Sequence, residues 1–295
     1  MINDQPHRRS YADEPGLLER VFSLLDLGFP GLPAHARALE PLGLQWDQVS
    51  TPFLSTSGDQ ALAHVGVLEL PMVASGRDMP VGGIHAVCTH PDHRRQGHFR
   101  SAMSEALAWC DKRYAAVMLI AGDPEIYEPF GFHVVKESRF VAQARRCAKA
   151  PDKRKRRRLD LHQPGDLRLL HRLLDERAPV SRRLGVKRGH GVFLFNQATK
   201  PMWYAEDLDA ILCLAVGEGV LRVHDLVAAR IPTLQEVIDP MQEPFDRVEV
   251  YFAPDQLGAS LSPEPHAVDQ DGLLMVRGEL PPRQAEVMLP YTARF

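Results

Sequence analysis

Apolar and polar residues recur along the chain with two different periods, and these periods predict an ordered series of helices and strands. Apolar residues at helical spacing predict helices over residues 17–27 and 97–113. Runs rich in apolar and β-branched residues predict strands over 62–72 and 81–89, with a turn at 76–80 between them. The first third of the chain therefore combines both kinds of element, and its two strands are expected to form a hairpin.

The pattern continues with a buried strand and later returns in a second form. A continuous apolar run over 115–121 predicts a strand that is covered on both faces, and strands over 132–135 and 139–144 are expected to complete a first unit. The order strand, helix, strand at 81–121 recurs at 220–252. We therefore expect an α/β fold with two tandem domains, the second much diverged, each a mixed, mostly antiparallel twisted sheet flanked by helices.

The boundary between these two domains is predicted in a stretch that is rich in cations. Residues 145–158 contain Pro151 and end in six consecutive basic residues, Lys153 to Arg158. The pattern of strands and helices restarts after them. We expect a first domain over 1–147, a basic linker over 148–158 and a second domain over 159–295.

Composition indicates an ordinary globular protein. The chain has 295 residues, which suits two domains, and its 44% hydrophobic and 25% charged residues are typical of a water-soluble chain. No stretch approaches the roughly 18 apolar residues of a membrane-spanning helix, and residues 1–5 lack the apolar segment of a secretory leader. The four cysteines form no CxxC pair, which favours reduced thiols and a cytoplasmic location.

A basic loop with a glycine joins the predicted strand 81–89 to the predicted helix 97–113. The N-terminus of a helix has unpaired N–H groups and a positive dipole end, so it binds phosphate groups. Gly97 lets the backbone approach such a group closely, and Arg94 and Arg95 add charge beside it. The N–H groups expected to face the anion are those of Gln96, Gly97, His98, Phe99 and Arg100.

The run from Val87 to Phe99 resembles the GCN5-related N-acetyltransferase (GNAT) superfamily. The resemblance implies two GNAT-like domains, acetyl-CoA as cosubstrate, and a pyrophosphate loop over residues 94–99. It also implies that Val87, Cys88 and Thr89 lie on a splayed central strand whose backbone pairs with the pantetheine arm. Phe99 replaces a small residue of the usual loop, and in this the sequence resembles the tandem-domain Eis-like branch. Enzymes of that branch carry a further sterol-carrier-like domain, for which this chain is expected to be too short.

The resemblance also implies the catalytic residues. Tyr127-Glu128-Pro129-Phe130-Gly131-Phe132 resembles the Y-x-x-F-G-F segment of the family, in which the tyrosine protonates the departing thiolate. A phenol pKa of about 10 lies close to the ~8.5 of a thiol, so this transfer is near balance. The Eis-like resemblance suggests the carboxylate of Phe295 as general base, and a water or a backbone carbonyl is the alternative. The second domain offers Pro232 and Thr233 at the corresponding junction, without a glycine, so a structural role is expected there.

Several alternatives stay open at this point. An acyl-CoA sensor without turnover would keep the loop, and a nucleic-acid-associated protein could use the basic run 153–158, although a solvated linker is favoured. His90 and His93 could ligate a metal, but Arg94 and Arg95 would repel a cation, so no metal is expected. The acceptor, an amine-bearing small molecule or peptide, is not defined by the sequence, and homo-oligomerisation stays open.

Overall fold

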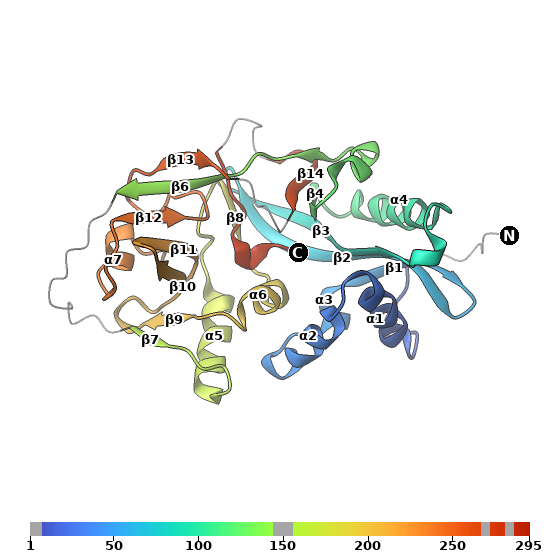
Figure 1. Ribbon diagram of the computed structural model, residues 1–295, viewed down its shortest axis with the longest axis horizontal. Helices are drawn as coiled ribbons and strands as arrows, with labels where there is room; N and C mark the ends of the chain where they lie inside the picture. Colours follow the sequence, from blue (N-terminus) through green and yellow to red (C-terminus); the bar gives the residue numbers. More distant parts are fainter. Residues whose placement is uncertain (1–7, 144–155, 267–271, 281–285) are drawn as a thin grey trace.

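The computed structural model describes residues 8–143, 156–266, 272–280 and 286–295, and places two mixed β-sheets next to each other with helices around them (Figure 1). In the first sheet the strands follow the order β1, β2, β3, β4, β14, β5, and β8 pairs with β2. β3 and β4 run parallel and the other neighbours antiparallel. The strands of this sheet are β1 (Thr51–Ser57), β2 (Gln60–Ala74), β3 (Arg77–Thr89), β4 (Ala116–Ala121), β5 (His133–Val134), β8 (Leu184–Val186) and β14 (Leu273–Gly278).

The second sheet repeats the plan of the first. Its strands follow the order β13, β6, β12, β11, β10, β9, β7. β11 and β12 run parallel with helix α7 (Leu234–Ile238) between them, as β3 and β4 do with α4 (His98–Cys110). The predicted fold of two related mixed sheets is confirmed. The strands of the second sheet are β6 (Ser138–Gln143), β7 (Arg156–Arg158), β9 (Trp203–Ala205), β10 (Ala210–Gly217), β11 (Val220–Val227), β12 (Arg247–Val250) and β13 (Ser262–Pro265).

Each sheet contains strands from the other half of the sequence: β8 and β14 in the first sheet, and β6 in the second. β14 lies between β4 and β5 of the first sheet, and β6 lies between β12 and β13 of the second. The prediction that residues 139–144 finish the first unit is therefore wrong, because β6 pairs antiparallel with β12 and so extends the second sheet. The division at 148–158 stays a prediction, since 144–155 lie outside the described residues, but Arg156–Arg158 form the edge strand β7 instead of a solvated linker.

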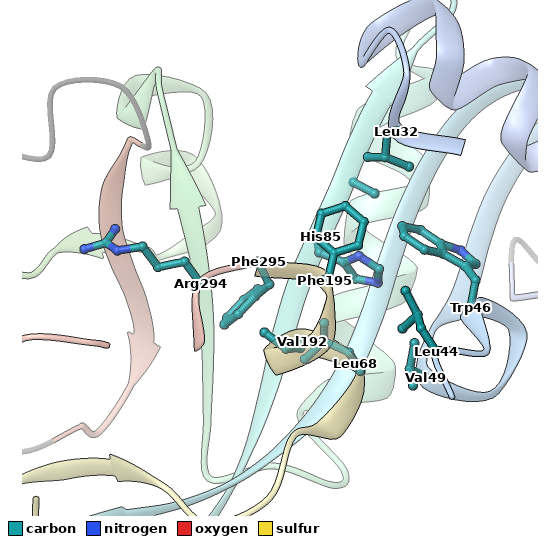
Figure 2. Close-up of a pocket in the computed structure, with 12 residues that line it drawn as sticks. Leu32, Leu44, Trp46, Val49, Leu68, His85, Val192, Phe195, Arg294 and Phe295 are labelled. Carbon is teal, nitrogen blue, oxygen red and sulfur yellow. The ribbon is translucent and has the colours of Figure 1, made fainter. Parts of the chain in front are cut away.

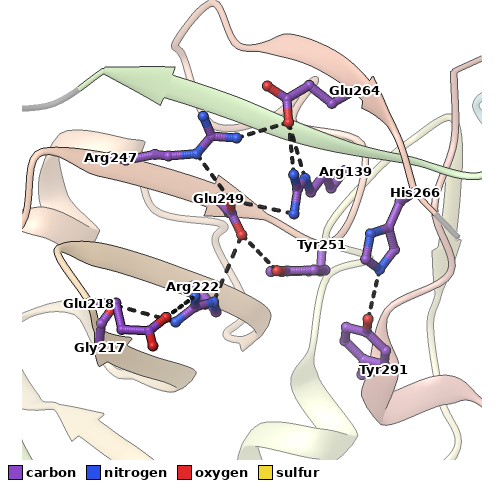
Figure 3. Close-up of polar contacts among 10 residues, drawn as sticks. All are labelled: Arg139, Gly217, Glu218, Arg222, Arg247, Glu249, Tyr251, Glu264, His266 and Tyr291. Atoms are coloured by element: carbon purple, nitrogen blue, oxygen red, sulfur yellow. Dashed lines mark hydrogen bonds and ion pairs between the residues drawn. The ribbon is translucent and has the colours of Figure 1, made fainter. Parts of the chain in front are cut away.

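A network of ion pairs joins β6 to its adopted sheet (Figure 3). Glu249 of β12 is buried and accepts from Arg247 Nε at 3.0 Å and from the Tyr251 hydroxyl at 2.8 Å. Arg139 of β6 approaches the Glu249 carboxylate at 3.5 Å and pairs with Glu264 of β13 at 3.0 Å. Because these residues come from three strands, the network holds β6, β12 and β13 in register.

Helices cover both faces of the first sheet (Figure 1). α1 (Leu17–Gly28), α2 (Leu32–Ala38) and α3 (Trp46–Val49) lie on one side, and α4 lies on the other. β4 is buried on both faces as its apolar run predicts: Val117 and Leu119 pack with α4, whereas Met118 packs with the C-terminal segment. The predicted helices at 17–27 and 97–113 are confirmed with slightly different ends, and the strand β1 was not predicted.

The space between the two sheets is filled by α5 (Pro164–Glu176), α6 (His190–Gln197) and the chain end. Leucines of α5 and α6 share one apolar cluster with α1 and with β10, so the core is continuous from one half of the molecule to the other. The last turn, η6 (Tyr291–Ala293), lies in the middle of the molecule (Figure 1). None of the helices in the described parts of the chain has the length and apolar character that a membrane crossing requires.

Candidate active site

β3 separates from β4 partway along its length and so leaves one of its edges unpaired. Val81 to Ile84 pair with Ala116 to Leu119, and β4 continues to Ala121 without β3 beside it. From His85 to Thr89 the strand is paired in the described sheet only with β2. The N–H and C=O groups on the other edge are therefore available to an extended ligand, because backbone groups require partners.

A bulge marks the point where the strand changes direction. The register of β2 against β3 shifts between His64 and Gly66, and Ala86 takes a left-handed conformation with φ of 49°. His64 Nδ1 lies 2.7 Å from the Ala86 oxygen, and since a carbonyl only accepts, this nitrogen carries the hydrogen. The His64 side chain, which has no exposed surface, therefore stabilises the bulge through this hydrogen bond.

Two buried histidines support this strand. Burial lowers the pKa of His64 to about 4, and burial together with the neighbouring His64 lowers the pKa of His85 to about 3. His85 Nε2 lies 2.9 Å from the Ser50 hydroxyl oxygen. Both rings are therefore neutral at physiological pH and act as hydrogen-bonding groups.

The loop after β3 presents a helix N-terminus together with unpaired cations. Arg95 and Gly97 have positive φ, at 62° and 91°, and α4 begins at His98 without a side-chain cap on its first N–H groups. Arg94, Arg95 and Arg100 are exposed, and within the described ranges none of them forms an ion pair. The local field therefore favours an anion at this position.

The end of β3, this loop and the segment after β4 enclose one cleft of about 600 Å³. It brings together nine of the ten residues predicted to bind the cosubstrate, and the predicted catalytic Tyr127. Gln96 does not line the cleft, and its side-chain amide donates to the Asp92 oxygen instead. His93 and Ile126 also line it and were not predicted. The predicted residues on its walls are Val87, Cys88, Thr89, Arg94, Arg95, Gly97, His98, Phe99, Arg100 and Tyr127.

Tyr127 lies between aromatic rings at the edge of this cleft. Its ring centroid is 6.0 Å from that of Phe99 and 6.2 Å from that of Phe132, both edge-to-face. Its hydroxyl forms no hydrogen bond with the part of the chain that the structure describes. Burial, with a smaller effect of Asp123, raises its pKa to about 12, so the phenol is protonated at neutral pH. The near balance with a thiol expected from reference pKa values does not hold in this environment.

A smaller cavity of about 100 Å³ lies beside β3 at the bulge, and Figure 2 shows its lining residues. His85 and Ala86 line this cavity, and Val87, the next residue of β3, lines the cleft. Phe295, predicted as a catalytic residue, lies here and not in the cleft. The remaining walls come from the α2 and α3 region, β2, α6 and the chain end: Leu32, Leu44, Trp46, Val49, Leu68, Gly191, Val192, Phe195 and Arg294.

A comparison with known families identifies the part of the chain that forms the cleft. The family model of the acetyltransferase (GNAT) domain matches residues 16–135. Residues 16–135 are a GNAT domain. The matched stretch runs from the start of α1 to the end of β5, and it contains every residue that lines the cleft.

Solved structures with a similar fold cover most of the chain. A probable N-acyltransferase from Enterococcus faecalis has 16% identity and a TM-score of 0.59, over 92% of this chain and 72% of that one. Eis1 from Mycobacterium abscessus has 17% identity and a TM-score of 0.56, over 93% and 73%. A GCN5-related N-acetyltransferase from Kribbella flavida has 18% identity and a TM-score of 0.53, and the match covers 88% of this chain and 68% of that one. These matches extend the likeness beyond the GNAT domain and support the Eis-like resemblance of the fold. Curated protein sequences give no match.

Buried polar contacts hold the chain end in place between the two sheets. The Thr292 hydroxyl donates to Asp225 at 2.5 Å, and Arg294 donates to Glu137 at 2.5 Å. The side-chain amide of Asn196 on α6 donates to the Arg294 carbonyl oxygen at 2.6 Å. These three contacts fix the position of Phe295, the next residue. Its ring lies close to Gly83 of β3, since a Cβ atom added to Gly83 would lie 2.8 Å from the ring.

Neither nearby acidic side chains nor the basic run contributes to the two cavities in the described parts of the chain. The carboxylates Asp26, Glu125 and Glu128 line neither cavity. Within the described residues no three His, Cys, Asp or Glu side chains are arranged to hold a metal ion. Lys153 to Lys155 of the basic run lie outside the described residues. Arg156 pairs with Glu243 at 2.5 Å and Arg157 with Asp166 at 2.7 Å, so these two charges are already neutralised.

Proposed function

We propose that this protein is an N-acetyltransferase that moves an acetyl group from acetyl-CoA directly to an amine. The observation that carries the proposal is one cleft in which a helix N-terminus, a strand edge, three arginines and the half-buried Tyr127 meet, with the arginines and the edge unpaired among the described residues. A thioester cosubstrate with a diphosphate needs these features together, because one end of it is an anion and the other an acyl group.

The residues of the cleft divide this work between them. The N–H groups of Gly97, His98 and Phe99 bind the diphosphate, with Arg94 and Arg100 adding charge. The free edge of Val87 to Thr89 pairs with the amide-containing arm and directs an N–H at the acyl oxygen, where negative charge develops. The side chain of Gln96 takes no part.

In the transfer the amine nitrogen forms a bond to the acyl carbon and the carbon–sulfur bond breaks. The amine proton passes to a base, and the sulfur receives a proton from Tyr127, so an amide and a thiol are the products. Although the pKa of Tyr127 is raised to about 12, the departing sulfur lies in the same cleft. Burial raises the pKa of a thiol too, so the gap between donor and acceptor is narrower than a comparison with a thiol in water suggests.

The base is proposed to be the carboxylate of Phe295. The contacts of Thr292 and Arg294 place this residue beside Gly83 and next to the bulge that separates the two cavities. A base at this position lies on the acceptor side of β3, opposite the tyrosine. Water or a backbone carbonyl near His85, whose ring is neutral, is the competing assignment.

The test measures acetyl-CoA binding by calorimetry and thiol release with amines. We expect binding that weakens as ionic strength rises and that falls about tenfold in Arg94→Ala, the loss of one charge-assisted hydrogen bond. Arg77→Ala, which removes an exposed arginine at the opposite end of β3, is the control and should bind as the wild type does. Absence of heat with acetyl-CoA, or equal weakening by both variants, would refute the proposal.

Thiol release separates the enzyme from its rivals. Turnover with any amine supports the transferase. Binding without release over a broad amine panel supports the acyl-CoA sensor instead. Salt-sensitive binding of an oligonucleotide that disappears when Lys153 to Arg158 are neutralised would support the nucleic-acid alternative.

A further inference from the structure

The walls of the smaller cavity are almost entirely apolar (Figure 2). Trp46, Leu68, Val192 and Phe195 point into the same space from three elements, α3, β2 and α6. None of the described side chains that line it is acidic. Its two ionisable side chains are His85 and Arg294.

Neither of these two groups makes the cavity polar. Burial keeps His85 neutral, and its Nε2 lies 2.9 Å from the Ser50 hydroxyl oxygen, with which it forms a hydrogen bond. The Arg294 side chain extends away from the other lining residues, and its guanidinium pairs with Glu137 at 2.5 Å. The cavity therefore offers hydrophobic contact to whatever enters it.

The position of the cavity relates it to the acyl end of the cleft. His85 and Ala86 line the cavity, and Val87 lines the cleft, so the bulge in β3 is the partition between them. A molecule with its apolar end in the cavity presents its other end at the strand edge proposed to hold the acyl group. Catalysis by proximity requires this arrangement of acceptor and donor.

The volume limits the size of the group that fits. The cavity measures about 100 Å³, and an apolar protein cavity of about 150 Å³ holds one benzene molecule. A short alkyl chain or a single small ring fills this space. A group with several charges does not suit it, because at most one charge could pair with the Phe295 carboxylate proposed as the base, and the others would lose their water without gaining a partner.

We propose that the cavity binds the apolar side chain of the acceptor, and that the acceptor class is a primary monoamine bearing a short alkyl group or a small ring. This inference rests on the proposed N-acetyltransferase function and specifies its substrate. The apolar surroundings also favour the unprotonated amine, which is the form that attacks an acyl carbon. Polyamines and polycationic sugars are excluded as good acceptors for the same reason.

The test is thiol release from acetyl-CoA with straight-chain amines from methylamine to hexylamine, with benzylamine and spermidine beside them. We expect kcat/KM to rise about fourfold per methylene group and to stop rising when the chain exceeds the cavity. Spermidine should be at least tenfold poorer than butylamine. A flat or falling series, or a preference for spermidine, overturns the inference.

Two substitutions change the volume in opposite directions. Val192→Phe fills the cavity and should abolish the preference for longer chains while methylamine still reacts. Phe195→Ala enlarges it and should move the optimum to longer chains. Val134→Phe makes the same substitution as the first variant on exposed β5 and should leave the series unchanged.

The result distinguishes this inference from the function on which it rests. Thiol release that favours charged or bulky amines in the wild type refutes the substrate class and leaves the transferase proposal intact. No release with any amine, while calorimetry still detects acetyl-CoA, refutes the transferase proposal and the inference with it. The wild-type series decides the matter even if a variant fails to fold.

Discussion

Among the individual residues, Tyr127 is placed by aromatic packing alone. The rings of Phe99 and Phe132 contact it edge-to-face, and its hydroxyl has no partner among the described residues. A phenol in such a site keeps its proton over a wide pH range and can direct it at a group entering the cleft. Phe99, the departure from the usual loop of the family, therefore packs against the tyrosine that we propose as the general acid.

We predict that Tyr127→Phe lowers kcat by about 10²-fold or more, the usual contribution of a general acid, and leaves the affinity for acetyl-CoA unchanged. Since the pKa of Tyr127 is about 12, the wild-type rate should not fall with rising pH below about pH 10. Thiol-release kinetics and calorimetry measure the two quantities.

Tyr114→Phe is the matched control. Tyr114 is also a buried phenol with its pKa raised to about 12, but it packs on Gly82 and lies outside the cleft. Loss of kcat in both variants would point to a structural effect and contradict the catalytic assignment.

We predict that the protein loses stability as the pH falls below about 6.5. The pKa values of His64 and His85 are lowered to about 4 and about 3, whereas an unfolded histidine titrates near 6.5. Below that pH the unfolded chain binds more protons than the folded one, so the free energy of unfolding decreases by up to about 1.4 kcal/mol per pH unit for each histidine.

Urea unfolding between pH 7.5 and 4.5 measures this dependence. In His85→Gln the free energy of unfolding should change less steeply with pH than in the wild type. A lower stability of the variant at pH 7.5 does not affect this comparison of slopes. An unchanged slope in the variant would mean that His85 is not the neutral, buried group described above.

Among the elements, the junction of β3 and α4 determines the chemistry of the cleft. The sequence predicted the strand, the loop and the helix at this junction, because periodicity, the glycine and the arginines are all local signals. It did not predict the bulge at Ala86, since the contact that stabilises it comes from His64 on another strand. Phe195 lines the smaller cavity only because α6 packs near β2 and α3, and no local signal in the sequence indicates this.

We predict that Gly97→Ala weakens acetyl-CoA binding by about tenfold or more, because a methyl group at this helix start would occupy the space where the diphosphate approaches. Gly97 has φ of 91° with nothing within 4 Å of an added Cβ. Binding by calorimetry and stability by urea unfolding measure the two consequences.

Gly16→Ala is a close control. Gly16 also precedes a helix, with φ of 79° and open space around an added Cβ, but it belongs to α1. Both variants should lose about 1–2 kcal/mol of stability from the left-handed conformation. Equal weakening of binding in both would remove the special role of the α4 N-terminus.

In the molecule as a whole, the two sheets depend on each other. β14 completes the sheet that forms the cleft, and β6 completes the sheet that packs behind it. No local signal in residues 138–143 or 273–278 tells which sheet they join, because an alternating strand pattern fits either edge. For this reason the sequence predicted two sheets and the order strand, helix, strand in each, but it assigned β6 to the wrong sheet.

We predict that residues 1–147 expressed alone do not form a stable domain. Without β14 the inner edge of β4 is exposed, and β6 has no partner for its backbone groups. Circular dichroism and sedimentation should report an unfolded or aggregated fragment. Co-expression of 1–150 with 151–295 should restore a soluble complex that binds acetyl-CoA. A soluble, cosubstrate-binding 1–147 fragment would instead establish an independent first domain.

The exchange of strands also orders events in time. Leu273 of β14 pairs with Ala121 of β4, more than 150 residues earlier in the chain. During synthesis on the ribosome, the half that emerges first must wait for nearly the last strand before its sheet can close. The sheet that forms the cleft is therefore expected to close only after β14 has been synthesised, and until then the nascent protein exposes an open strand edge on which chaperones can act.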